Sequence, residues 1–233
     1  MPNLTIKGIS FYYETHGDAE PLVYIAGVGL DLSEYDDYLI RPLSKHFKVL
    51  AFDNRGSGRS DKPNEPYSIA MMADDTIGLM DALGIEKAVV VGLSLGGRIA
   101  MELALSYPER VEKLVLVSTS ARVKNTWRRP MLGVLQALAS LLPFKSGKYP
   151  QPRYAFKRQL QASSGYDATS RLSSLTVPTL ILHGRKDKLV PFHLVEEMHA
   201  AIRNSQLKTF EGGHLLFVFE PQKLLEAIVS FAG

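Results

Sequence analysis

The residues best suited to covalent chemistry lie in the run Gly92-Leu93-Ser94-Leu95-Gly96, which follows an apolar stretch and precedes a helix-like one. A serine on a sharp turn from strand to helix takes a strained conformation, so its neighbours two residues away on each side must lack bulk. Such a turn exposes the hydroxyl and points the first N–H groups of the helix at developing negative charge. The spacing predicts Ser94 as a nucleophile, with a glycine-rich packing turn as the alternative.

A serine hydroxyl is a weak nucleophile at neutral pH and needs an adjacent base that a carboxylate orients. The chain has six histidines. His214 is favoured as the base, because it follows the last expected strand and Gly212-Gly213 leaves the backbone free to turn the imidazole inward. His16 precedes the core, and His193 and His199 lie on an expected helix beside acidic residues, where solvated side chains are the ordinary outcome.

The elements that must position these residues alternate along the chain. Short apolar runs predict buried strands at 22–25, 48–52, 88–91, 114–117, 177–182 and 207–210. Helical patterns fall at about 68–83, 94–107 and 194–202 and after residue 221, and residues 4–15 predict an opening hairpin. This alternation predicts the α/β class: a doubly wound, mostly parallel sheet with helices on both faces and an antiparallel hairpin at its N-terminus.

The pattern breaks between residues 121 and 172, where the sequence predicts no strand. This stretch holds ten basic residues and one acidic residue, whereas the whole chain has a net charge of only +3. A leucine-rich helix is expected to end at Pro143, and a second helix is expected around 153–161. We expect a small helical cap, or lid, at 121–172, inserted into a core that residues 1–120 and 173–233 form.

Leu132, Leu135 and Leu138 fall on one face of the leucine-rich helix. Packing onto the core explains such a face, but it could also roof an acyl pocket, which makes these leucines candidate substrate-binding residues. The basic residues of the cap fit a solvated lid, a guide for anionic substrates such as carboxylates or acyl-CoA, or a membrane-surface contact. Nucleic acid is not an expected partner, because aromatic residues do not interleave regularly with the charges.

The run Phe52-Asp53-Asn54-Arg55-Gly56-Ser57-Gly58-Arg59-Ser60 resembles the D-x-R-G-x-G-x-S turn that is typical of α/β-hydrolases after the fourth strand. Tyr107-Pro108-Glu109-Arg110-Val111 is similar to the segment after the nucleophile helix of that family. The resemblance covers about residues 20–120 and 175–233 and implies the α/β-hydrolase fold, in a branch similar to serine esterases and enol-lactonases. It does not extend to the cap, and it says little about the substrate.

Relatives of this kind carry their catalytic residues in the order serine, acid, histidine. The loop Gly184-Arg185-Lys186-Asp187-Lys188-Leu189-Val190-Pro191 is similar to the family's G-x-x-D-x-x-x-P loop, which implies Asp187 as the acid; a solvated aspartate between lysines is the alternative. The resemblance also implies that the backbone N–H groups of Val28 and Leu95 form the oxyanion hole. Ala26 stands where relatives usually carry histidine, which leaves the shape of this loop open.

Other chemistries find little support. Neither Gly27-Val28-Gly29 nor Gly56-Ser57-Gly58 completes a G-x-G-x-x-G motif, no G-x-x-x-x-G-K-S/T occurs, and metal-ligand spacing such as H-E-x-x-H is missing. We therefore expect no cofactor and no metal. A chain without cysteine has no thiol nucleophile. Serine rather than aspartate at the turn also argues against dehalogenases and epoxide hydrolases.

The bulk composition is that of an ordered globular protein. The 233 residues suit one domain, and 45% of them are hydrophobic and 22% charged. The N-terminal residues lack the basic and apolar regions of a signal peptide, and no apolar stretch approaches the length of a bilayer span. We expect a cytoplasmic monomer or homodimer without stable membrane insertion.

Together these features predict a Ser–His–Asp hydrolase that cleaves a carboxylic ester, lactone or thioester of small to medium size through an acyl-enzyme. The resemblance also permits a C–C bond hydrolase, a cofactor-free perhydrolase or the menaquinone-pathway lyase, to which Gly96-Gly97-Arg98 shows a slight similarity. A small-molecule receptor with vestigial hydrolysis is a further alternative, because fold does not fix function. The sequence leaves open the acyl chain length, the leaving group and the oligomeric state.

Overall fold

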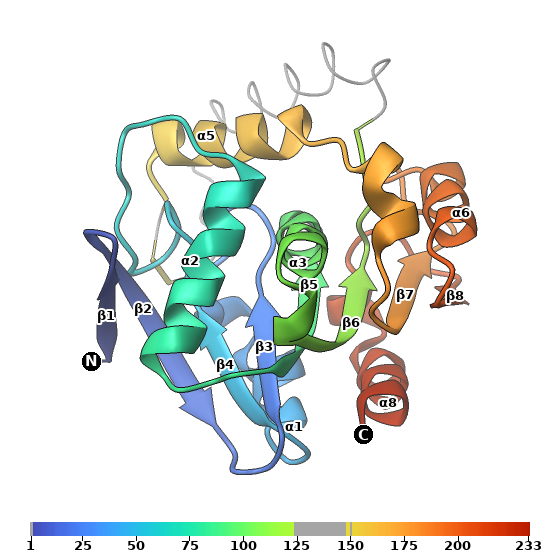
Figure 1. The fold of residues 1–233 in the computed structure, drawn as a ribbon, viewed down its shortest axis with the longest axis horizontal. Coiled ribbons are helices and arrows are strands. Elements are labelled where there is room, and N and C mark those ends of the chain that lie inside the picture. Colours follow the sequence, from blue (N-terminus) through green and yellow to red (C-terminus); the bar gives the residue numbers. More distant parts are fainter. Residues whose placement is uncertain (1, 124–147, 150) are drawn as a thin grey trace.

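A single sheet of eight strands forms the centre of the computed structural model, which describes residues 2–123, 148–149 and 151–233. The strand order is β1-β2-β4-β3-β5-β6-β7-β8 (Figure 1). The strands are β1 Asn3–Ile6, β2 Ile9–His16, β3 Pro21–Ile25, β4 Lys48–Phe52, β5 Ala88–Leu93, β6 Val111–Val117, β7 Thr179–Gly184 and β8 Ser205–Phe210. Strands β3 to β8 run parallel, whereas β1 pairs antiparallel with β2, and β2 with β4.

Helices connect the strands. They are α1 Arg41–Leu43, α2 Ile69–Ala82, α3 Leu95–Ser106, α5 Arg153–Gly165, α6 Phe192–Ala201, α7 Leu216–Phe219 and α8 Pro221–Ala232. Short 3₁₀ turns lie at Leu32–Glu34, Pro108–Arg110 and Thr169–Ser174, and a π turn at Asp36–Ile40. The Ser68 hydroxyl caps α2 by accepting the Met71 N–H, as Ser at this position commonly does. Within the described ranges, no helix combines the length and apolar character that a membrane crossing needs.

Both faces of the sheet are covered by helices. Val23, Val90 and Ile181 point to one face, where they join a core with residues of α2, α3 and α6. Leu22, Val91 and Leu182 point to the other face, where they join residues of α8. This burial on both sides explains the unbroken apolar runs of the central strands. The predicted fold class, a mostly parallel doubly wound sheet with an antiparallel N-terminal hairpin, is confirmed.

The segment predicted to form a cap is described only in part. Leu132, Leu135 and Leu138 lie outside the described residues. Helix α5 begins at Arg153, as predicted, and continues past the predicted end at Gln161 to Gly165. In Figure 1 this helix lies across the carboxyl edge of the sheet, beyond the ends of α2 and α3. The division of the chain into core and cap stays a prediction.

The loops that follow four parallel strands meet at this same edge. Strand β3 leads into residues 26–31, β5 into Ser94, β7 into residues 185–191 and β8 into residues 211–215. The carboxyl ends of parallel strands share one edge of a sheet, so these loops bring distant parts of the chain together. Every residue singled out above as catalytic or as an oxyanion donor follows one of these strands.

Candidate active site

Ser94 lies at the turn between β5 and α3 in a backbone conformation, φ 53° and ψ −108°, that few residues other than glycine adopt. A side chain at Gly92 would collide with the Gly96 backbone, and one at Gly96 would collide with the carbonyl of Ile25. The Ser94 N–H donates to the Val117 carbonyl at 2.9 Å, which helps to hold the turn. The two glycines of the motif are therefore a steric requirement of this geometry.

His214 lies between Ser94 and Asp187 and is within hydrogen-bond distance of both. Its Nε2 is 3.1 Å from Ser94 Oγ, and its Nδ1 is 2.7 Å from Asp187 Oδ2. The other oxygen of Asp187 accepts the N–H groups of Leu189 and Val190, at 2.8 Å each. These two donors fix the carboxylate, so that its free oxygen can orient the imidazole. The structure thus brings together the three side chains that the sequence singles out.

The charge state of Asp187 follows from its surroundings. Burial alone would raise the pKa of this carboxyl, yet the pKa lies below its usual value, because the hydrogen bond to His214 and the Val190 N–H favour the ionised form. The carboxylate is therefore ionised at neutral pH. It accepts the Nδ1–H of His214, and this tautomer leaves Nε2 free to accept the serine proton.

The two backbone groups predicted to form an oxyanion hole lie beside the serine in the fold. Leu95 is the first residue of α3, and the first N–H groups of a helix have no acceptor within it. Val28 lies in the loop after β3 and lines the same cavity as Ser94. Their role as oxyanion donors stays a prediction.

Two side chains from different parts of the chain hold the loop that carries Val28. Asn54 Nδ2 donates to the Ala26 carbonyl at 3.1 Å, and Gln159 Oε1 accepts the Gly29 N–H at 2.9 Å. Asn54 belongs to the turn after β4, whereas Gln159 comes from α5. The loop is therefore held by one side chain from the core and by one from the segment predicted as the cap.

The charged residues of the turn after β4 are engaged in structural bonds. Asp53 accepts the N–H groups of Leu32 and Arg59, at 2.8 Å each. Arg55 donates twice to Asp75, at 2.5 and 2.6 Å, in a buried bidentate ion pair. The motif that carries the family resemblance thus serves to fix the shape of the loops around the site.

A cavity of about 270 Å³ opens beside Ser94 and His214. The apolar side chains that line it include Val28, Leu30, Leu93, Phe156, Leu160, Leu189, Val190, Leu194 and Phe217. Phe156 and Leu160 come from α5, so the predicted cap contributes to its walls. Pockets for small molecules usually measure about 300–1,000 Å³, so this volume lies near the lower end of that range.

Comparison with known proteins identifies the family of the chain. The family model described as "alpha/beta hydrolase fold" matches residues 20–154, and one described as "Serine hydrolase (FSH1)" matches residues 89–222. The chain belongs to the α/β-hydrolase fold family. It is 30% identical to the AB hydrolase superfamily protein YisY of Bacillus subtilis, over 98% of this chain and 97% of that protein.

Solved structures of hydrolases are similar along their whole length. A hydrolase from Pseudomonas aeruginosa PA01 has a TM-score of 0.89 at 30% identity, with 100% of this chain and 98% of that chain covered. The enol-lactonase from Burkholderia xenovorans LB400 has a TM-score of 0.85 at 25% identity, with 99% of each chain covered. These likenesses support a hydrolase and leave the substrate open.

His183 is a buried residue of this α/β-hydrolase to which the sequence analysis assigned no role. Its Nε2 donates to the Val190 carbonyl at 3.0 Å and lies 3.6 Å from Asp187 Oδ2. Burial lowers the pKa of His183, so the ring is neutral at neutral pH. It packs against the carboxylate that orients His214. The sequence signal that could have identified His183 was its position in β7, four residues before Asp187.

Gln159 was also missed. It is fully buried, and its Nε2 donates to the Arg55 carbonyl at 2.8 Å and to Ser57 Oγ at 3.0 Å, in addition to the bond with Gly29. One side chain thereby joins α5 to the loop after β3 and to the turn after β4. No local pattern in the helix sequence marks this glutamine for burial.

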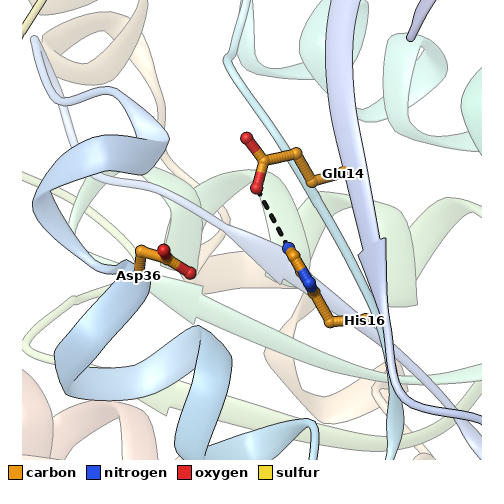
Figure 2. Close-up of side chains that lie close together, drawn as sticks. All are labelled: Glu14, His16 and Asp36. Atoms are coloured by element: carbon orange, nitrogen blue, oxygen red, sulfur yellow. Dashed lines mark hydrogen bonds and ion pairs between the residues drawn. The ribbon is translucent and has the colours of Figure 1, made fainter. Parts of the chain in front are cut away.

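Glu14, His16 and Asp36 form a second polar cluster, away from Ser94, whose possible ligand atoms lie within 4.8 Å of one another. Figure 2 shows His16 facing Glu14, with Nε2 3.0 Å from Oε2. Glu14 also accepts the Tyr12 hydroxyl at 2.7 Å, and Asp36 accepts from Arg41 at 2.8 Å. Of the residues that the structure describes, these three are close enough to hold a metal ion, and one buried oxygen of the cluster, Asp36 Oδ1, has no hydrogen-bond partner among them.

Proposed function

We propose that this chain is a serine hydrolase that cleaves a carboxylic ester, or a lactone or thioester, of small to medium size through an acyl-enzyme. The observation that carries the proposal is the pair of hydrogen bonds from Ser94 through His214 to the buried Asp187, beside an apolar cavity. Similarity to an enol-lactonase supports an ester-type carbonyl as the point of attack.

In the acylation step, His214 Nε2 takes the proton of Ser94 while Oγ attacks the carbonyl carbon. The electron pair of the C=O bond moves to the oxygen, and the N–H groups of Val28 and Leu95 stabilise this oxyanion. The tetrahedral intermediate then collapses, the C–O bond to the leaving alcohol breaks, and the imidazolium gives its proton to that alcohol. The acyl group remains on Ser94.

In the second step, His214 takes a proton from water while the water oxygen attacks the acyl carbon. The bond from Ser94 Oγ to the acyl carbon breaks, and the serine regains its proton as the acid leaves. Asp187 stays ionised and stabilises the imidazolium in both steps. Phe156 and Leu160, from the proposed cap at 121–172, shield these charges from bulk water, which strengthens their interaction.

The test compares wild type with Ser94→Ala, using a fluorophosphonate probe and p-nitrophenyl esters from acetate to decanoate. We expect labelling and turnover in wild type, both lost in Ser94→Ala, and an optimum among the short acyl chains because the cavity is small. Ser106→Ala, at the far end of α3, is the matched control and should behave as wild type. Labelling without turnover would favour the lyase, C–C hydrolase or receptor alternatives, and folded wild type that does not label would refute the proposal.

A further inference from the structure

Arg98 is a buried cation in the wall of the apolar cavity. It lies one turn into α3 and lines the cavity together with Ser94. Only 6% of the residue is exposed. Its hydrogen-bond partners among the described residues are neutral: the Ser120 carbonyl accepts from Nε at 3.1 Å, and the hydroxyls of Ser120 and Ser163 accept from the two terminal nitrogens.

Other arginines of this region are paired with acids. Arg122 lines the same cavity and donates to Glu197 at 2.6 Å, and Arg171 donates to Glu102 at 2.5 Å. For Arg98, no described acidic side chain forms such a pair. Taking a charge out of water without a counter-charge is unfavourable, and burial lowers the pKa of Arg98 to about 10. The group nevertheless stays charged at neutral pH, so an anion that entered the cavity would remove this cost.

We infer that Arg98 binds a carboxylate of the substrate inside the cavity. This inference rests on the proposed function, because it names the substrate class of the same site. A guanidinium presents five N–H groups in a plane that matches a carboxylate, and three of them donate to the described neutral acceptors. Ser94 and Arg98 are one helical turn apart, so only a short spacer would separate the carbonyl that Ser94 attacks from the carboxylate, and the proposal places both groups in the acyl part of the substrate. The class is the half ester of a short dicarboxylic acid.

The walls of the cavity favour this assignment. Largely apolar lining with a few placed polar groups is the usual composition of a small-molecule site, in which the polar groups set orientation. Apolar surroundings also strengthen the attraction between unlike charges. A neutral acyl chain would fill the same space but would leave the guanidinium without a counter-charge. Discrimination between a charged and a neutral end of the acyl group is therefore the property to measure.

Binding is measured first, on Ser94→Ala, by titration calorimetry with monoethyl glutarate and with the same ester whose carboxylate is replaced by a carboxamide. We expect the carboxylate to bind roughly tenfold to hundredfold more tightly, as for a close pair of desolvated charges. The preference should vanish when Arg98→Met is added. Equal binding of the two ligands to Ser94→Ala would overturn the inference.

Turnover is measured next, as ethanol release from the monoethyl esters of succinic, glutaric and adipic acid and from their carboxamide counterparts. In wild type, kcat/KM should favour the carboxylates, with one chain length preferred, and Arg98→Met should lower only the carboxylate rates, by about tenfold to hundredfold. Arg98→Lys should keep part of the preference. Arg158→Gln, which removes a positive charge from α5 outside the cavity lining, should keep all of it.

The outcomes separate the possible roles of Arg98. Equal losses on both substrates in Arg98→Met would make the residue structural, and an equal effect of Arg158→Gln would assign the preference to long-range attraction; either result overturns the inference. If thermal melting shows that Arg98→Met does not fold, the inference is tested by the Arg98→Lys variant and by the preference of wild type for the carboxylate substrates. If the proposed function fails, the protein will show no labelling and no turnover of any ester. A binding preference of Ser94→Ala for the carboxylate ligand would still support carboxylate binding by Arg98.

Discussion

Replacing Gln159 with leucine tests whether α5 holds the loop that carries Val28. Leucine fills a similar space but removes three buried hydrogen bonds, to the Gly29 N–H, the Arg55 carbonyl and Ser57 Oγ. Each buried polar group that loses its bond costs about 1–3 kcal/mol. The two backbone groups alone should therefore lower the free energy of unfolding by about 2–6 kcal/mol.

The same substitution should slow catalysis, because a displaced loop moves one oxyanion donor. Loss of one such donor lowers kcat by about a hundredfold to a thousandfold. Asn54 still holds the loop through the Ala26 carbonyl, so we expect a smaller fall, roughly tenfold to hundredfold, with little change in KM. Gln159→Glu keeps the acceptor for Gly29 and loses the donor to Arg55, so its kcat should be intermediate.

Thermal melting and p-nitrophenyl acetate hydrolysis measure the two effects separately. For a chain of this size each kcal/mol shifts the Tm by about 2–4 °C, so a loss of about 3 kcal/mol lowers the Tm by about 6–12 °C. Gln161→Leu, an exposed position on the same helix, is the matched control and should change neither quantity. A Gln159→Leu variant that melts lower but keeps the wild-type kcat would refute the link between α5 and the oxyanion loop.

Two further predictions concern the acid side of the site. Asp187→Asn should lower kcat about ten-thousandfold, because the amide favours the wrong His214 tautomer; a fall of less than about tenfold on p-nitrophenyl acetate would contradict the assigned role. Burial lowers the pKa of folded His183 below the unfolded value of 6.5, so the unfolded chain binds protons more readily as the pH falls. The stability contributed by the neutral ring is present above about pH 6.5 and is lost as the pH falls toward the folded pKa. The Tm deficit of His183→Gln relative to wild type should therefore shrink between about pH 7.5 and about pH 5.5, and a constant deficit would contradict this account.

The fold could be predicted because its signals are local. Apolar runs covered on both faces identify the central strands, and the interruption between 121 and 172 separates a segment with a different composition. The placement of Ser94, Asp187 and His214 follows from the same information, since each comes directly after a predicted strand and parallel strands end at one edge. Their distances of 2.7 and 3.1 Å were not predictable, although their proximity was. Their catalytic roles stay predictions.

The residues that the sequence analysis missed share one property, which is that their partners lie far away in the chain. Gln159 bonds to Gly29, 130 residues earlier, and to Arg55, 104 residues earlier. Neither helical periodicity nor a motif can predict such a contact, because the sequence around each of the two partners has no unusual feature. His183 differs, since Val190 and Asp187 are close in sequence, but an apolar strand gives no sign that its histidine turns toward a carboxylate.

The basic residues show why counting charges along the sequence does not identify the cation that recognises a substrate. A count of charges along the sequence treats the ten basic residues of 121–172 as equivalent, and it suggests that segment as a guide for anions. Of the described basic residues in that segment, Arg122 lines the cavity but is paired with Glu197. A cation in contact with solvent acts through water and salt, whose screening length is about 8 Å at physiological ionic strength, so it contributes little to the recognition of one group. Arg98 lies outside that segment and is a single charge, but it faces an apolar cavity and lacks a described acidic partner. Burial rather than number therefore determines which cation can select a substrate, and burial is known only once the chain is folded.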